Sequence, residues 1–300
     1  MSDGPIEVTV CVCTFRRAQY LPHLLHALGK QVTGGKFMHS IIVVDNDVAE
    51  SARDVVRQLA AAGAVNVRYF VQPERNIAMT RNVAIAHAHG EFVAFIDDDE
   101  VPVDDWLLLL LNSCLGHGAA GVLGPVEPRF ATPPARWILA GGFFERPKHP
   151  TGVAIGLSDA RTGNALLRRS VVDGMAMPFD PRFANGGEDV DFFRRVLTAG
   201  HRLVWCNEAV VYETVPASRC TRRYLLRRAL LRGQNNFRQR EGRAGRLLAS
   251  AVALPTYAVL LPVLLVAGHH HFMRFLIKFC DHLGRLGACF GFNLVASRDP

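Results

Sequence analysis

A chain of 300 residues is long enough for one large domain, or for a catalytic domain of roughly 200–250 residues with an appendage. Hydrophobic residues make up 49% of it, which is ample for a substantial core and excludes a chain too polar to bury one. The formal charge of +7 indicates an anionic partner such as a nucleotide, an anionic lipid or a nucleic acid. This charge is concentrated, because residues 219–246 contain ten arginines and a single acid, Glu241.

The first hundred residues alternate between apolar runs of strand length and stretches with helical periodicity. The runs at 8–13, 41–44, 67–71 and 92–96 predict strands, and helices are predicted around 21–28, 49–62 and 77–87. Short apolar strands separated by helices favour βαβ units and a mostly parallel sheet.

The later elements are less regular. We predict helices at 104–115 and 188–199, and strands near 119–123, 168–172 and 202–211. The proline-rich segment 127–150 predicts a long loop, and such loops in compact domains are usually functional or mobile.

The seven cysteines form no C-x-x-C pair, and Cys11 and Cys13 alternate within the first strand. An odd number without a framework predicts reduced thiols in the cytosol. Residues 1–7 are short and mostly polar, so we expect no signal peptide before the first strand.

The last third of the chain changes character. Residues 219–246 are basic and predicted to be helical, and 247–267 are 21 residues without a charge, long enough to span a bilayer. Pro255 and Pro262 interrupt this stretch and basic residues flank both sides, which favours a re-entrant hairpin or a surface-lying segment over a simple crossing.

The following segment has the pattern of an interfacial amphipathic helix. Its apolar face is Phe272, Phe275, Leu276, Phe279, Leu283 and Leu286, and its opposite face is Arg274, Lys278 and Arg285. The alternative is a C-terminal hairpin that packs on the core. We therefore predict a catalytic domain over 1–216 and a helical membrane-associating region over 217–300.

Polar residues follow three of the predicted strands. Thr14 follows the first strand, Asp45 begins the polar run after the second, and Asp97, Asp98 and Asp99 follow the fourth. In open α/β sheets, ligands bind beyond the carboxyl ends of the strands. These groups are therefore expected at one edge of the sheet.

Three adjacent aspartates repel each other unless one is protonated or a cation lies among them. Mg²⁺ or Mn²⁺ with a substrate diphosphate would neutralise the cluster. The alternative is an acidic turn that caps the next helix, where negative charge is favourable. An Asx turn after a strand would equally explain Asp45. The chain contains neither G-x-x-x-x-G-K-[ST] nor G-x-G-x-x-G after a strand, which excludes these phosphate loops.

A second acidic group, Glu188 and Asp189 with Asp191, follows Gly186 and Gly187. Acids at a helix start are ordinarily caps. The glycine pair permits a sharp entry, however, which would let Asp189 face a pocket.

Five segments in this order resemble family 2 glycosyltransferases with the GT-A fold, which are inverting enzymes that use nucleotide-diphosphate sugars. They are VCVCTFRR at 10–17, VVDND at 43–47, ERNIAMTRNVAI at 74–85, GEFVAFIDDDEVP at 90–102 and GGEDVDFFRR at 186–195. The stretches RTGN at 161–164 and VYETVPASR at 211–219 are more narrowly similar to the bacterial ExoM-like transferases, which extend lipid-linked exopolysaccharide repeat units.

The resemblance implies a set of roles. Thr14, Asp45 and Arg81 would contact the nucleotide, with Asp45 on the base. Asp97, Asp98 and Asp99 match the D-x-D motif, with Asp99 as the direct metal ligand and Asp97 at the other outer position. Gly163 and Asn164 would line the donor-sugar or acceptor side. Asp189 would be the general base with Glu188 beside it. Glu213 stands where many relatives have a metal-binding His. The cofactor implied is Mg²⁺ or Mn²⁺.

The resulting hypothesis is a transfer from a nucleotide-sugar donor to a lipid-linked saccharide at the cytoplasmic face of the inner membrane, with an anionic membrane surface as partner. The Q-x-x-R-W motif of processive synthases is absent, which favours one sugar per encounter. The alternatives are a polyprenyl-phosphate glycosyltransferase, whose ionised acceptor needs no strong base, and a non-catalytic carbohydrate-binding protein on the same fold. A nucleic-acid partner is not expected, because the aromatics of the arginine segment form no stacking platform.

Overall fold

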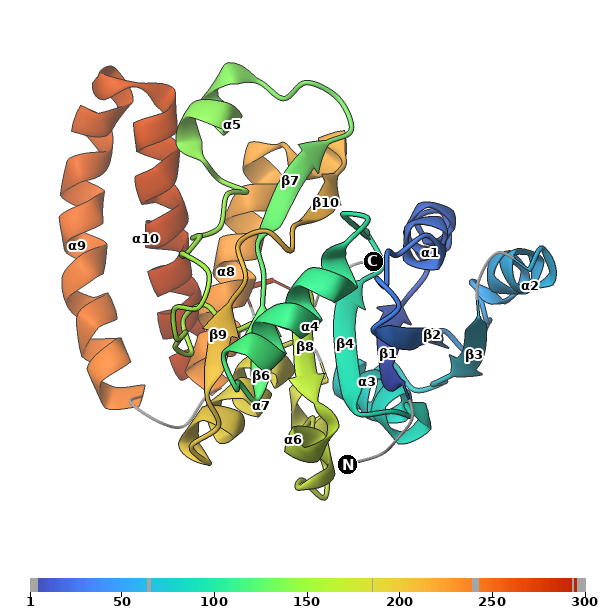
Figure 1. Ribbon diagram of the computed structural model, residues 1–300. Helices are drawn as coiled ribbons and strands as arrows, with labels where there is room; N and C mark the ends of the chain where they lie inside the picture. Colours follow the sequence, from blue (N-terminus) through green and yellow to red (C-terminus); the bar gives the residue numbers. More distant parts are fainter. Residues whose placement is uncertain (1–4, 64–65, 185, 239–242, 293, 296–300) are drawn as a thin grey trace. The chain divides into compact units, whose positions relative to one another are not determined.

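A computed structural model describes residues 5–63, 66–184, 186–238, 243–292 and 294–295. Its main feature is a seven-stranded sheet with the strand order β3-β2-β1-β4-β8-β6-β9 (Figure 1). The strands are β1 (Ile6–Thr14), β2 (Phe37–Asp45), β3 (Val67–Val71), β4 (Phe92–Asp97), β6 (Gly121–Leu123), β8 (Asn164–Arg168) and β9 (Leu203–Trp205).

The first half of the sheet is parallel, as predicted. Strands β3, β2, β1 and β4 pair in parallel, and the register places Thr14 beside Asp45 and Cys13 beside Asp97. The helices that connect these strands are α1 (Leu21–Gly29), α2 (Arg53–Ala61) and α3 (Ile77–His87). The carboxyl ends of β1, β2 and β4 therefore meet at one edge of the sheet.

Two apolar layers cover the two faces of the sheet. Helices α1, α2 and α4 (Trp106–Gly116) contribute to one core cluster, and α3, α6 (Arg169–Asp173) and α7 (Glu188–Thr198) contribute to the other. Alternate residues of β1 enter each layer, since Val10 lies in the first and Cys11 in the second. Burial on both faces explains why these strands are continuous apolar runs.

The second half of the sheet corrects the expected elements. The strand predicted at 168–172 is wrong, because β8 ends at Arg168 and α6 begins at the next residue. Strand β8 runs antiparallel to β4 and β6, and this brings Asn164 beside Ile96 at the edge that holds the acids. The helix predicted at 188–199 is confirmed as α7, whereas the single strand predicted at 202–211 is replaced by β9 and by the start of a further strand at Val211.

The segment 127–150 is not one loop, as had been expected. It contains most of β7 (Val126–Phe130) and all of α5 (Arg136–Gly141). A three-stranded sheet has the order β5-β10-β7, where β5 is Glu100–Pro102 and β10 is Val211–Val215. The antiparallel pairing of β5 with β10 places Glu213 opposite Glu100.

The chain forms two compact units. The first contains Met1–Glu127 and Arg146–Glu213, and the second contains Pro128–Glu145 and Thr214–Asp299. The chain passes from one unit to the other within β7 and β10. A compact unit is not by itself an independent domain, so the division at residues 216 and 217 stays a prediction.

The second unit is built on three long helices, α8 (Arg222–Arg238), α9 (Arg243–Ala267) and α10 (His269–Cys289) (Figure 1). Two glycines let α8 and α10 approach closely. A Cβ atom on Gly233 would lie 2.0 Å from the carbonyl oxygen of Asp281, and one on Gly284 would lie 2.2 Å from that of Leu230. Side chains at these two positions would separate the helices.

Helix α9 is continuous, although Pro255 and Pro262 lie inside it. Its segment Ala244–Ala267 is long and apolar enough to cross a membrane, by length and composition, and only 6% of its apolar window is buried. On α10, Arg285 is buried and donates to Ser250 of α9 and to Asp281. Arg285, predicted on the helix face opposite the apolar one, therefore packs inside this unit.

Candidate active site

The carboxyl edge of the sheet joins residues that are far apart in the sequence. Thr14, the last residue of β1, donates a 2.8 Å hydrogen bond from Oγ1 to Oδ2 of Asp98, which directly follows β4. Both side chains are buried. The predicted meeting of the first and fourth strand ends is therefore present in the structure.

Arg17 carries the positive charge that offsets the carboxylates of Asp98 and Asp99. Its Nη1 lies 3.2 Å from Oδ1 of Asp98 and 3.2 Å from Oδ2 of Asp99. Burial raises the pKa of Asp98 to about 7, although Arg17 acts to lower it. The repulsion expected among adjacent carboxylates is thus relieved by an arginine that had been given no role.

Asp97 differs from the other two aspartates in its exposure. Its side chain is 46% exposed, whereas that of Asp99 is 7% exposed. Oδ1 of Asp97 lies 3.6 Å from Nη2 of Arg81, a residue of α3. Asp97 is therefore the carboxylate of the trio that opens most to a ligand.

Arg81 also forms a buried ion pair with Glu188, at the first position of α7. Burial raises the pKa of Glu188, and Arg81 opposes this rise. Burial also disfavours the charge of Arg81, but the attraction of Glu188 and Asp97 keeps its pKa above the ordinary value. One guanidinium thus joins the two acidic groups that the sequence analysis singled out separately.

Asp189 stands beside Glu188 in the first turn of α7. The chain enters this helix through Gly186 and Gly187, whose φ angles of 114° and 93° lie in the left-handed region that glycine tolerates. Asp189 is half-buried, and its Oδ1 accepts a 2.8 Å hydrogen bond from the backbone N–H of Val190. Glu188 is engaged by Arg81, so Asp189 is the better placed of the two to meet a ligand.

Gly163 lies against the acids because it has no side chain. A Cβ atom there would lie 2.8 Å from Oε1 of Glu100 and 3.3 Å from Oδ2 of Asp97. Glu100 is buried, and its Oε1 has no hydrogen-bond partner. Burial raises the pKa of Glu100 well above the ordinary value. The Asp97 and Glu100 oxygens thus face the same small space beside the Gly163 backbone.

Two predicted binding residues have extensive internal contacts. Asp45 is fully buried and accepts hydrogen bonds from Tyr69 Oη at 2.9 Å and from the backbone N–H of Ala52 at 2.8 Å. Asn164 accepts a 2.8 Å bond from Nε1 of Trp106 and donates through Nδ2 to the carbonyls of Pro125 and Ala209. Both side chains stabilise the loops that surround the edge of the sheet.

Glu213 lies near the acidic edge, but an arginine is beside it. Nη2 of Arg146 donates a 2.6 Å hydrogen bond to Oε2 of Glu213. Burial lowers the pKa of Arg146, while Glu213, Glu100 and Asp97 raise it by more. Arg146 lies in the segment expected to be a loop, where the sequence gives no sign of such a role.

The donor atoms fit a divalent cation. Within the ranges that the structure describes, no group of three His, Cys, Asp or Glu side chains converges on one point as a ready metal cage. Mg²⁺ and similar hard cations commonly use one or two carboxylates together with substrate phosphates and water. Open Asp97 and neighbouring Asp99 provide such a partial set. These residues therefore suit an ion that binds together with a diphosphate.

Comparison with known proteins agrees with this architecture. Residues 9–175 match the family model described as glycosyl transferase family 2. The chain belongs to this family. It is 34% identical over 253 residues to the succinoglycan biosynthesis protein ExoM of Rhizobium meliloti (strain 1021), which covers 83% of this chain and 77% of that protein. The recognition of a family 2 enzyme from sequence motifs is confirmed.

Two solved structures have folds similar to that of this chain. The mannosyltransferase PcManGT of Pyrobaculum calidifontis, in complex with GDP-Man and Mn²⁺, has a TM-score of 0.64 at 18% identity, covering 96% of this chain and 88% of that one. Residues 1–349 of S. aureus TarS in complex with UDP give a TM-score of 0.55 at 15% identity, covering 95% and 92%. This chain spans 55% of the longer TarS chain. The predicted GT-A-type fold is confirmed.

Proposed function

We propose that the chain is an inverting glycosyltransferase that moves a sugar from a UDP-sugar to a hydroxyl group of a lipid-linked saccharide in exopolysaccharide synthesis. The observation that supports this most directly is the link made by Arg81 between Asp97, at the end of β4, and Glu188, beside Asp189. It supports a joint role for Asp97, a carboxylate suited to a diphosphate-bound cation, and Asp189, a carboxylate suited to accept a proton. The similarity to ExoM supports the pathway.

The nucleotide-sugar is proposed to lie over the carboxyl ends of β1, β2 and β4. Thr14 and Asp98 would support the nucleotide through their mutual hydrogen bond, and Arg81 would approach the diphosphate. Asp45 is proposed to act on the base through the loop that it holds, since its carboxylate is covered. This arrangement follows the general rule that ligands bind at the carboxyl edge of such sheets.

Asp97 and Asp99 are proposed to hold Mg²⁺ or Mn²⁺, the second of which is present in the complex of PcManGT. A bound cation would supply Lewis-acid stabilisation to the leaving diphosphate. Because Arg17 lies 3.2 Å from Asp99, direct coordination by Asp99 requires the guanidinium to move aside. Coordination by Glu213 would likewise require the guanidinium of Arg146 to move aside, so we assign Glu213 a smaller part in cation binding.

Asp189 is proposed as the general base. Its carboxylate takes the proton of the acceptor hydroxyl while the acceptor oxygen forms a bond to the anomeric carbon. The bond from that carbon to the diphosphate oxygen breaks on the opposite side, and the nucleoside diphosphate leaves with the electron pair. Inversion of the anomeric centre follows from this in-line geometry. Positioned proton transfer typically contributes about 10²–10⁴-fold to such a rate.

Full-length protein in detergent provides the decisive test. It should release nucleoside diphosphate from one member of a panel of nucleotide sugars, and should label the lipid extract of the producing cells with the sugar. The product linkage, determined by NMR, should have the opposite anomeric configuration to the donor. Retention of configuration, or failure of every donor in the panel, would overturn the proposal.

The second unit is proposed to hold the enzyme on the cytoplasmic face of the inner membrane. Helix α9 exposes large apolar side chains to solvent, among them Val259 at 74%, Val263 at 66% and Val266 at 90%. Helix α8 adds exposed arginines such as Arg223 and Arg228. Each basic residue near an anionic surface is worth about 1 kcal/mol, and apolar burial adds a contribution that salt does not screen.

A further inference from the structure

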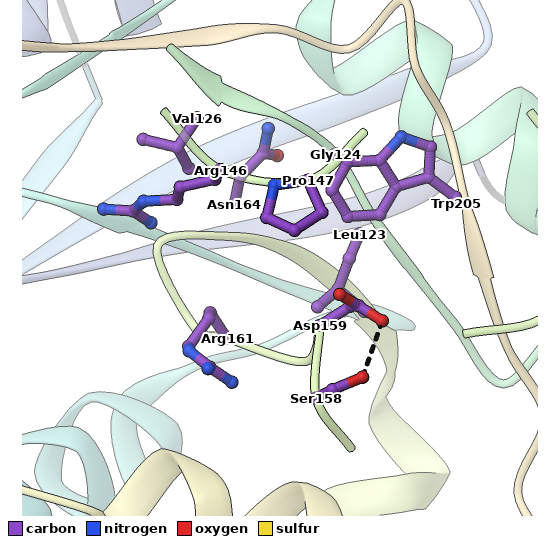
Figure 2. Close-up of a pocket in the computed structure, with 10 residues that line it drawn as sticks. All are labelled: Leu123, Gly124, Val126, Arg146, Pro147, Ser158, Asp159, Arg161, Asn164 and Trp205. Atoms are coloured by element: carbon purple, nitrogen blue, oxygen red, sulfur yellow. Dashed lines mark hydrogen bonds between the residues drawn. The ribbon is translucent and has the colours of Figure 1, made fainter. Parts of the chain in front are cut away.

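A pocket lies in the first unit on the β6–β9 side of the sheet, and of its lining residues only Asn164 was expected from the sequence to meet a ligand (Figure 2). Its floor is at the carboxyl end of β6, where Leu123 pairs with Trp205 of β9. The lining residues are Leu123, Gly124, Val126, Arg146, Pro147, Ser158, Asp159, Arg161, Asn164 and Trp205.

The outer wall of the pocket is fixed by main-chain hydrogen bonds. The backbone N–H of Gly152 donates to the carbonyl of Trp205 at 2.8 Å, and the N–H of Trp205 donates to the carbonyl of Val153 at 2.9 Å. Ala154 forms a β-bridge with Val204. The segment that contributes Pro147, Ser158 and Asp159 is therefore attached to the edge strand β9, and the pocket is formed before a ligand arrives.

The chemistry of the lining is divided between apolar and polar sides. Figure 2 shows the Trp205 ring beside Pro147, with Asp159, Ser158 and Arg161 on the other side of the opening. Ser158 Oγ donates a 2.8 Å hydrogen bond to Oδ2 of Asp159, and His149 lies 3.4 Å from Oδ1 of the same carboxylate. A sugar ring has the complementary surface, because it combines apolar C–H groups with several hydroxyls that both donate and accept hydrogen bonds.

The charges of the lining favour a neutral ligand. Arg146 is paired with Glu213, and Asp159 and Arg161 contribute one negative and one positive charge to the lining. A phosphate or carboxylate entering here would meet Asp159 at close range, and like charges repel. Hydroxyl groups can instead donate to the Asp159 carboxylate and accept from the Arg161 guanidinium.

The position of the pocket separates it from the proposed nucleotide. Neighbouring strands lie about 4.8 Å apart, so β6 is about 10 Å and β9 about 14 Å from β4 in the strand order. Thr14 and Asp45 lie on the opposite side of β4. Arg146 connects the pocket to the acidic edge, because it lines the pocket and pairs with Glu213, which stands opposite Glu100.

We propose that this pocket is the acceptor subsite and holds the terminal, uncharged pyranose ring of the saccharide that receives the sugar. Asp159 and Arg161 bind its hydroxyls, and Trp205 and Pro147 contact its apolar face. This inference rests on the proposed glycosyl transfer, and it assigns the substrate class to residues for which the family motifs give no role.

Fluorine NMR of protein labelled with 5-fluorotryptophan tests the assignment directly. The chain has three tryptophans, and the Trp205 signal is identified by its loss in Trp205→Phe. The probes are methyl glycosides of glucose, galactose, mannose and N-acetylglucosamine, with inorganic phosphate as the anionic probe. We expect at least one glycoside to shift the Trp205 signal saturably, and Asp159→Asn and Arg161→Ala to weaken this binding about tenfold or more.

Transfer kinetics provide the second measurement. The same two variants should raise the KM for the lipid-linked acceptor about tenfold, with unchanged affinity for UDP and for the UDP-sugar. Arg57→Ala, an exposed arginine of α2, is the matched control and should behave as wild type. An unchanged thermal midpoint of each variant shows that the fold is intact.

Several outcomes would overturn the assignment. A signal that responds to phosphate but to no glycoside would make the pocket an anion site, and weaker binding of the UDP-sugar but not of UDP would make it the donor-sugar site. Transfer by wild type with an unchanged acceptor KM in both variants would also exclude it. If the wild type binds and cleaves no nucleotide sugar, the proposed function itself has failed; a glycoside shift that Asp159→Asn abolishes would then still support a saccharide site.

Discussion

The guanidinium of Arg81, on α3, is paired with the carboxylate of Glu188, the first residue of α7. Both side chains are less than one-tenth exposed. Removing one partner of such a pair leaves a buried charge without compensation, which typically costs 3–5 kcal/mol. We therefore predict that Arg81→Met lowers the free energy of unfolding by about 3–5 kcal/mol, measured by denaturant titration of the detergent-solubilised protein.

Glu188→Gln in the Arg81→Met background is the control for this effect. The double variant removes both charges, so it should recover much of the lost stability while transfer activity stays low. Equal stability of the wild type and the single variant would show that the ion pair is not part of the native site.

Asp189→Asn is predicted to separate donor binding from chemistry. The substitution keeps the shape of the side chain but removes the proton acceptor, so transfer should fall by orders of magnitude while the affinity for UDP-sugar stays near wild type. Glu188→Gln should also weaken donor binding, because it releases Arg81. An unchanged transfer rate in Asp189→Asn would favour a lipid phosphate acceptor, which is already ionised.

Loss of either Asp97 or Asp99 is predicted to abolish the cation dependence of nucleotide binding. Calorimetry with UDP and Mn²⁺ should show no cation-dependent binding for either Asp97→Ala or Asp99→Ala. Arg17→Met should leave Asp98 and Asp99 without their counter-charge and raise the Mn²⁺ affinity, because the cation no longer competes with the guanidinium. UDP binding that still depends on Mn²⁺ in Asp99→Ala would refute the assignment of Asp99 as a ligand.

Asp45→Asn is predicted to act on stability in a pH-dependent way. Burial raises the pKa of Asp45 above its ordinary value of 3.8, although hydrogen bonds from Ala52 and Tyr69 lower it. A raised native-state pKa contributes stability that is full below pH 3.8 and is lost as the pH rises through the native value. The deficit in the thermal midpoint of Asp45→Asn should therefore be largest below pH 3.8 and shrink as the pH rises through the native pKa. A deficit that grows with pH would show that the native pKa is lowered instead.

The membrane proposal predicts that charges on the exposed face of α9 abolish lipid association. Val259→Glu combined with Val263→Glu should stop the full-length protein from floating with vesicles that contain anionic phospholipid. Wild type should float even at 1 M salt, where screening shortens to about 3 Å. Met38→Glu, at an exposed apolar position in the first unit, is the control and should float normally. Flotation of the double variant would contradict the proposal.

The sequence predicted the parallel half of the sheet well because its strands are continuous apolar runs. It failed at β8, since Asn164–Arg168 is short and contains residues that also favour helices, whereas the β-branched pair Val171 and Val172 lies in α6. Periodicity cannot show that β8 turns back against β4. That reversal is what places Gly163 and Asn164 at the acidic edge.

Within the candidate site, the carboxylates were predictable and their partners were not. A run of acids after an apolar strand is visible in one dimension, but Arg17 meets Asp98 and Asp99, and Arg81 meets Glu188, across 81 or more positions. Arg146 lies in a proline-rich segment whose folding could not be predicted, and only the folded chain brings it beside Glu213. Pairing over such separations depends on the whole topology.

The seam between α9 and α10 contains polar groups, with Ser250, His282 and Arg285 in mutual hydrogen-bonding contact, while the outward side of α9 is apolar. In aqueous buffer the apolar side of α9 is exposed to the solvent. Under the proposed membrane association, molecules stripped of detergent would cover that side with one another, so a stoichiometry measured in plain buffer would report pairing through the membrane-binding face. Subunit counts for this enzyme should therefore be compared between plain buffer and nanodiscs or native membrane patches.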